Sequence, residues 1–113
     1  LRADLELLCG QIISDLGDEQ RAPMIVNMME RAQHDPTVAT VRDEFFRAFS
    51  EVFHTVIRGG VDAGALRCDI DPDRAMAALL GSFLFARFMS PEPFDDHFAD
   101  ALLDDFISVN APR

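Results

Sequence analysis

The chain has 113 residues, so we expect a single domain over residues 1–113 that buries an apolar core. Its net charge of −10 argues against direct nucleic-acid binding, because a phosphate backbone would be repelled. The absence of lysine excludes Schiff-base chemistry, and the two cysteines, Cys9 and Cys68, match no metal or redox spacing. No signal peptide or membrane-length apolar run occurs, and we expect a cytoplasmic protein with reduced thiols.

Apolar residues recur at helical spacing through most of the chain, and no segment alternates as a half-buried strand does. The sequence therefore predicts an all-α fold, a single five-helix domain. Because the helical pattern is already under way at the first residue, we expect the chain to be a piece of a longer protein. The expected helices, in chain order, are Leu1–Leu16, Glu19–Gln33, Thr37–Ala63, Pro72–Ser90 and Asp95–Val109.

The first two expected helices meet at a short polar turn. Gly17 is expected to end the first helix, and Asp18 is expected to cap the second. The second helix is unusually rich in methionine, a flexible side chain favoured where a surface accepts varied shapes. The third helix is the longest, and we expect it to close at Gly64.

Methionine and phenylalanine side chains of these helices are first of all expected to pack in the core. A cavity between helices is the alternative, since it is a usual place for a ligand site in an all-α domain. The ten phenylalanines come with no tyrosine or tryptophan, so the aromatic set offers a ligand no hydrogen bond and favours a largely apolar one. The candidate ligand-binding residues are Met24, Met28, Phe46, Phe49, Phe53 and Phe83.

The fourth expected helix begins with a strong start signal. Asp71 suits the N-cap, and Pro72 suits the first helical position. Asp69, Asp71 and Asp73 alternate as in a calcium loop, but the required glycine is missing and Leu80 occupies the position of the final glutamate. The segment is therefore interpreted as a helix start.

That helix has almost no polar face, so its apolar residues must pack against other parts of the protein on more than one side. A rotation of 100° per residue divides it into two sides. One side, assigned to the core or pocket, is formed by Ala75, Met76, Leu79 and Phe83. The opposite side, assigned to contact with a second copy of the chain, is formed by Ala77, Ala78, Gly81, Phe85 and Phe88, although the inverse assignment stays open.

The sequence shows no pattern typical of catalysis or metal binding. His34, His54 and His97 stand apart, and Asp96 and Asp100 could place carboxylates beside His97 on one helix face. Such a grouping is common by chance and lacks a second histidine or cysteine at ligand spacing. No serine lies in a nucleophile motif. We therefore expect no catalytic residue, no metal and no cofactor.

The segment from Gly60 to Pro72 has a glycine-containing turn, then Leu66-Arg67, then the Asp-x-Asp-Pro helix start. It resembles the C-terminal regulatory domain of TetR-family (tetracycline repressor-like) transcription regulators. The resemblance implies a homodimer in which the last two helices of each copy form a four-helix bundle, which adds Phe98 and Leu102 to the dimer interface. It also implies a small-molecule effector, and DNA binding through an N-terminal helix-turn-helix domain absent from this chain.

Two other readings remain open at this level. A stand-alone helical interaction module would use the same apolar helices to hold a different partner, and a small helical enzyme would need a polar cleft. A basic helix-turn-helix pattern upstream would favour the regulator over the interaction module. The use of arginine in place of lysine, with abundant alanine and aspartate, indicates a bacterial source.

Overall fold

The computed structural model describes all 113 residues and contains helices without strands. The prediction of an all-α, five-helix domain is confirmed, and the expected helix boundaries differ from the observed ones by at most two residues. The helices are α1 Arg2–Gly17, α2 Arg21–Arg31, α3 Pro36–Asp62, α4 Pro72–Phe88 and α5 Asp96–Val109.

Aspartate side chains cap the starts of the last three helices. Asp35 and Asp71 each precede a proline and accept hydrogen bonds from backbone N–H groups of the first turn of α3 and α4. Asp95 accepts from the backbone N–H of Phe98 at the start of α5. These bonds satisfy donors that have no partner within the helix. The interpretation of Asp71 as a helix cap is thus confirmed.

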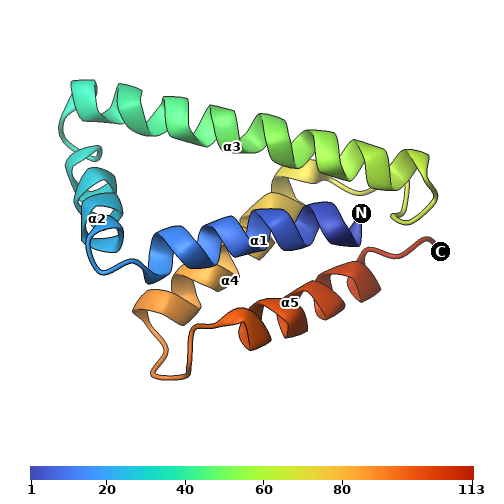
Figure 1. Ribbon diagram of the computed structural model, residues 1–113. Coiled ribbons are helices and arrows are strands. Elements are labelled where there is room, and N and C mark those ends of the chain that lie inside the picture. The colour runs from blue at the N-terminus through green and yellow to red at the C-terminus, as the bar shows by residue number, and fades with distance from the viewer.

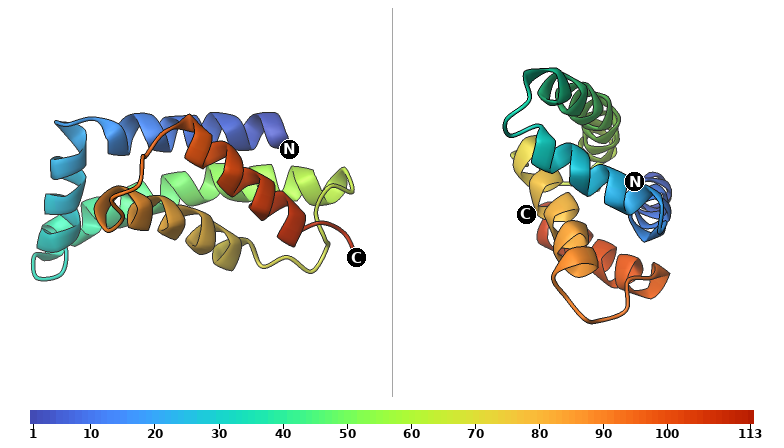
Figure 2. Two further views of the ribbon diagram at one scale, coloured as in Figure 1. Left: turned by 90° about the horizontal axis from the view of Figure 1, so that it is seen from below. Right: turned by 90° about the vertical axis from the view of Figure 1, so that its left-hand side faces the viewer.

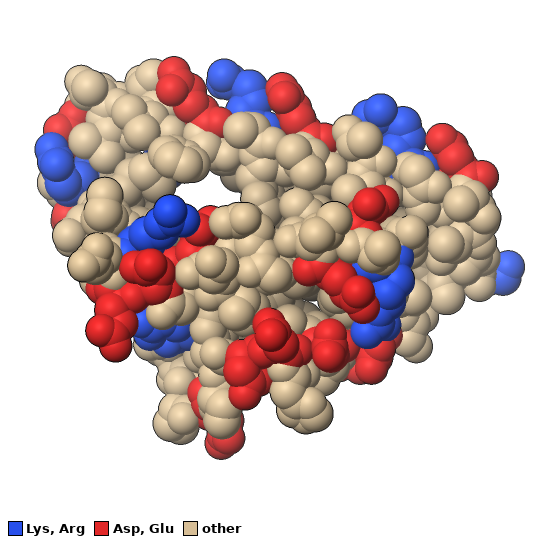
Figure 3. All heavy atoms as spheres, viewed as in Figure 1, with Lys and Arg blue, Asp and Glu red and all other residues tan.

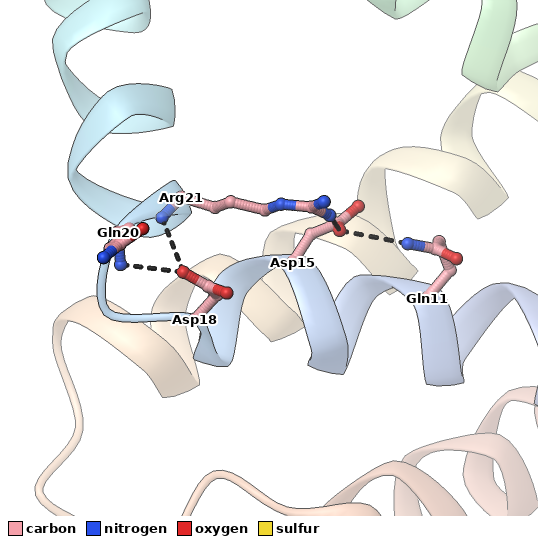
Figure 4. Close-up of polar contacts among 5 residues, drawn as sticks. All are labelled: Gln11, Asp15, Asp18, Gln20 and Arg21. Atoms are coloured by element: carbon pink, nitrogen blue, oxygen red, sulfur yellow. Dashed lines mark hydrogen bonds and ion pairs between the residues drawn. The ribbon is translucent and has the colours of Figure 1, made fainter.

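The corner between α1 and α2 has the expected helix end and the expected Asp18 cap, but not a left-handed glycine. Gly17 is the last residue of α1 and does not take a left-handed conformation; the chain leaves the helix through an extended Asp18. The Asp18 carboxylate accepts from the backbone N–H groups of Gln20 and Arg21, at 2.8 and 2.9 Å (Figure 4). These bonds favour the ionised carboxylate and lower the pKa of Asp18 below its usual value.

The end of α3 follows the expected pattern. Gly64 has a φ of +74°, and the preceding turn brings the backbone N–H groups of Ala65 and Leu66 onto the carbonyl of Gly60. Gly60 is buried against the Leu66 side chain: a Cβ atom at Gly60 would lie 2.8 Å from Leu66 Cδ1. The turn therefore needs a glycine at 64 for conformation and one at 60 for space.

In the view of Figure 1, helix α1 lies in front, between α3 and α5, with α4 behind it. The two views of Figure 2, from below and from the α2 end, show α1 at one face of the molecule and α4 at the opposite face. The core forms where α1, α4, α5 and the C-terminal half of α3 meet. Its largest fully buried side chains include Phe53 of α3, Phe83 of α4 and Leu5 of α1.

The opposite end of the molecule is open. In α3 the buried residues begin only at Ser50, and α2 contains a single buried residue, Ala22. The space-filling view shows an opening beneath α3, bordered by α2 and α1 (Figure 3). We call this opening the α1–α2–α3 hollow. It lies where α2 holds the first half of α3 away from α1.

Candidate functional site

Helix α4 divides into a buried and an exposed side, as its sequence predicts. The predicted inward set, Ala75, Met76, Leu79 and Phe83, is buried. All five residues of the predicted outward set are exposed, with Phe85 at 62%. The division of the helix is thereby confirmed, whereas the role of the outward side in dimerisation stays a prediction.

A long cleft runs along the outer side of α4 and α5, and we call it the α4–α5 cleft. Its two parts share Ala78, Ser82 and Leu102, and the part toward the Pro91–Pro93 loop has a volume of about 660 Å³. A Cβ atom at Gly81 would meet no atom within 4 Å. The cleft therefore leaves room over Gly81. Six of the seven predicted dimer residues line that part: Ala77, Ala78, Gly81, Phe85, Phe98 and Leu102.

The other part of the cleft ends in polar groups. Arg67 of the α3–α4 connection and Arg74 of the first turn of α4 lie there with Asp105 of α5. The Arg67 backbone N–H donates to the carbonyl of Asn110, whereas its side-chain Nε is buried and has no hydrogen-bond partner. The cleft is thus apolar along its middle and charged at this end.

The predicted ligand residues occupy two different environments. Phe53 and Phe83 are fully buried in the core, and Phe83 packs against Phe98 of α5 with ring centroids 5.6 Å apart. Phe49 is half-buried and stacks on Phe53, with centroids 6.3 Å apart. Phe46 is 57% exposed although it lies seven residues before Phe53, on the same face of α3. That face therefore continues from the core into the α1–α2–α3 hollow.

The two predicted methionines belong to α2. Met24 is 69% exposed and Met28 is half-buried, and they stand one turn apart on the same flank of the helix. The structure thus brings the methionines and Phe46 to the open end of the molecule and Phe53 and Phe83 to the core. Phe49 lies between the two environments.

A polar group that the sequence analysis missed lies at the edge of the α1–α2–α3 hollow. Gln11 and Asp15 stand one turn apart on the side of α1 that faces α3, and Arg21 reaches toward them from α2 (Figure 4). Asp15 Oδ1 accepts from Gln11 Nε2 at 3.0 Å and from Arg21 Nη1 at 2.7 Å. The four-residue spacing of Gln11 and Asp15 is visible in the sequence, but the direction of Arg21 depends on the α1–α2 corner.

Two contacts join the helices around the hollow to α4. Arg87 of α4 donates from Nε to the carbonyl of Leu16, at 2.7 Å, near the end of α1. His54 Nε2 lies 2.8 Å from Asp73 Oδ1 at the start of α4. The structure thus places His54 at the polar edge of the α3–α4 contact. Both ends of α4 are thereby fixed to neighbouring helices.

The remaining titratable and metal-ligating side chains form no further centre. Burial raises the pKa of the Cys9 thiol to about 11, because the thiolate would lose its hydration there. Cys68 is free and exposed. No three side chains of histidine, cysteine, aspartate or glutamate gather in an arrangement that could hold a metal ion. None of the five helices combines the length and the apolar character that crossing a bilayer requires.

The five-helix arrangement is an all-α domain with an open hollow at one end and an apolar outer cleft on its last two helices. The sequence profile described as "Tetracyclin repressor-like, C-terminal domain" matches residues 1–106. The chain belongs to this family, and its members are parts of regulatory, non-enzymatic proteins. Comparisons with curated proteins and with solved structures gave no match.

Proposed function

We propose that this chain is the effector-sensing and dimerisation domain of a bacterial transcriptional repressor. A separate N-terminal helix-turn-helix domain would bind the operator, and a small, largely apolar molecule in the α1–α2–α3 hollow would change its affinity for DNA. The family assignment carries this proposal. The net charge of −10 supports it, because such a domain would leave DNA contact to another part of the protein.

The proposed dimer pairs α4 and α5 with their copies in a four-helix bundle. The exposed apolar residues of α4 and the open space over Gly81 support this choice, because small residues let two helices approach closely. The α4–α5 cleft would then be covered by the second copy. The proposed interface residues are Ala77, Ala78, Gly81, Phe85, Phe88, Phe98 and Leu102.

The dimer is tested with Gly81→Arg and sedimentation equilibrium. We expect the unchanged chain to sediment as a dimer and the variant as a monomer, because a long charged side chain would fill the space between the two α4 helices. Gly10→Arg is the matched control, since Gly10 is also an exposed helical glycine with open space around it, but on α1. A dimeric Gly81→Arg variant of normal helicity would reject this face, and a monomeric unchanged chain would reject the dimer.

The effector site is proposed at the open end of the molecule. Met24, Met28, Phe46 and Phe49 would contact the effector, with Phe53 and Phe83 as the core behind them. Binding alters DNA affinity if the effector prefers the arrangement of the two subunits that does not fit the operator. Phe46 is exposed on the face of α3 that is buried from Ser50 onward, which supports the site, because an apolar ligand would cover it.

A fluorescence titration with Nile red, a neutral apolar dye, tests this site. We expect saturable binding to the unchanged domain and a loss of at least tenfold in affinity for Phe46→Arg, which places a charge in the hollow. Val109→Arg changes an exposed apolar residue at the far end of α5 and should leave binding unchanged. Equal binding by all three proteins would show that the dye, and by extension an apolar effector, does not use the hollow.

A further inference from the structure

The edge of the α1–α2–α3 hollow carries a carboxylate that is only partly occupied. The Asp15 side chain is 35% exposed, and both of its hydrogen bonds end on the same atom, Oδ1. Oδ2 has no partner within the protein. Because Gln11 uses its NH2 group toward Asp15, its carbonyl oxygen is also free to accept. The edge therefore offers two unused acceptors, one of them charged.

The present partner of Asp15 is easily displaced. Arg21 comes from the first residue of α2 and its side chain is 62% exposed. An ion pair this accessible contributes little to stability, because water and salt screen it. Another cation that brings apolar contacts of its own could take the place of the guanidinium.

The charged groups of the α1–α2 corner also favour a cation, and the neighbouring Arg87 is already engaged with the Leu16 carbonyl at 2.7 Å. Asp18 and Glu19 follow Asp15 within the α1–α2 corner, and Arg42 on α3 is already paired with Asp43 at 3.2 Å. The opposite wall offers phenylalanine rings, whose faces attract cations electrostatically. Negative charge on one side and aromatic surface on the other suit a molecule that is both apolar and positively charged.

We propose that the effector is a lipophilic cation whose charge replaces the Arg21 guanidinium beside Asp15. Its apolar body lies against Met28, Phe46 and Phe49, and its charge lies at Asp15 Oδ2 and the Gln11 carbonyl. The exchange releases Arg21 and with it the first turn of α2 from α1. The α1–α2 corner, which Arg87 joins to α4 through the Leu16 carbonyl, then becomes free to shift.

This inference rests on the proposed effector site, and two probes of matched shape test it. Tetraphenylphosphonium and tetraphenylborate have nearly the same size and apolar surface but opposite charge. We expect isothermal titration of the domain to show tetraphenylphosphonium binding at least tenfold more tightly than tetraphenylborate. Asp15→Asn should reduce that affinity at least fivefold, while Asp62→Asn, an equal charge change at the far end of α3, should change it less than twofold.

Arg21→Gln gives the decisive comparison. Asp15→Asn and Arg21→Gln break the same ion pair, so a merely structural role for the pair would move the affinity for tetraphenylphosphonium in the same direction. Our proposal requires opposite directions: Arg21→Gln removes the competing cation and should raise the affinity at least threefold. Changes in the same direction, or tighter binding of tetraphenylborate by the unchanged domain, would overturn the proposal. Nile red distinguishes a failure of this inference from a failure of the proposed effector site. If the dye binds at the hollow while the preference for the cation is absent, this inference fails and the effector site stands.

Discussion

Phe53 and Phe46 lie on the same face of α3, two turns apart, and meet different surroundings. Phe53 is fully buried among residues of α1, α4 and α5, whereas Phe46 is 57% exposed at the α1–α2–α3 hollow. The side chains are identical, so the difference in exposure comes from their neighbours. Helices α1, α4 and α5 cover Phe53, whereas α2 does not cover Phe46. One helix thus contributes its second half to stability and leaves its first half available to a ligand.

The largest expected effect is at Phe53. Phe53→Ala should lower the free energy of unfolding by about 3–5 kcal/mol, because it empties a closely packed site. Phe46→Ala should change it by no more than about 0.5 kcal/mol, as is usual at exposed positions. Urea denaturation of both variants measures the difference. Equal losses would show that the hollow closes over Phe46 in solution and would remove the contrast.

Gly59 and Gly60 test how closely the second half of α3 is packed. Gly60→Ala should lower the free energy of unfolding by about 1–2 kcal/mol, because the new methyl group overlaps the buried Leu66 side chain. Gly59→Ala meets no neighbour and should raise it by about 0.5–1 kcal/mol through better helix propensity. Urea denaturation of both variants shows whether the free energy of unfolding falls for one and rises for the other. A stabilising Gly60→Ala would mean that Leu66 packs more loosely than the structure shows.

The start of α4 tests how much the Asp71 helix cap contributes to the stability of the domain. Asp71→Ala should lower the free energy of unfolding by about 1 kcal/mol, because two backbone N–H groups lose their acceptor. Asp69→Ala, two residues earlier, is the control, since Asp69 caps nothing and pairs only loosely with Arg67 at 3.8 Å. Thermal unfolding followed by circular dichroism distinguishes them. Equal shifts in Tm for the two variants would contradict a specific capping role.

The smallest expected effect concerns pH and the corner beside the hollow. The pKa of Asp18 is lowered from 3.8 in the folded chain, so its charge contributes stability above that value and the contribution is lost as the pH falls through the folded pKa. Asp18→Asn keeps an acceptor but not the charge, and its stability should fall less steeply below pH 4. Asp100→Asn should not reproduce the change. Parallel curves for the unchanged chain and Asp18→Asn would rule out the backbone bonds as the cause.

Local sequence signals predicted most of the fold. The Asp-Pro pairs before α3 and α4 and the glycine at position 64 fix helix ends by bonds within a few residues, so they can be recognised without the tertiary structure. The division of α4 into buried Leu79 and exposed Phe85 followed from the helical repeat alone. Helix α1 ends at Gly17 as expected, but the glycine does not adopt the left-handed conformation, and the chain turns away through the extended Asp18.

The site was less predictable because it depends on angles between helices. Periodicity places Phe46 and Phe53 on one face of α3, but it does not say that α2 holds the first half of that helix away from α1. The Gln11–Asp15–Arg21 group depends in the same way on the α1–α2 corner, which directs Arg21 back along α1. Properties of one helix could be derived from its sequence, whereas the space between three helices could not.

Chemical-shift mapping of Nile red binding to the isotope-labelled domain tests the central claim most directly. The account predicts that the changes gather on α2, on the first half of α3 around Phe46, and on the Gln11–Asp15 side of α1, while the α4–α5 cleft keeps its shifts. Changes confined to the cleft around Gly81 and Phe85 would contradict it, because the exposed apolar surface that binds small molecules would then be the one we assign to the second copy.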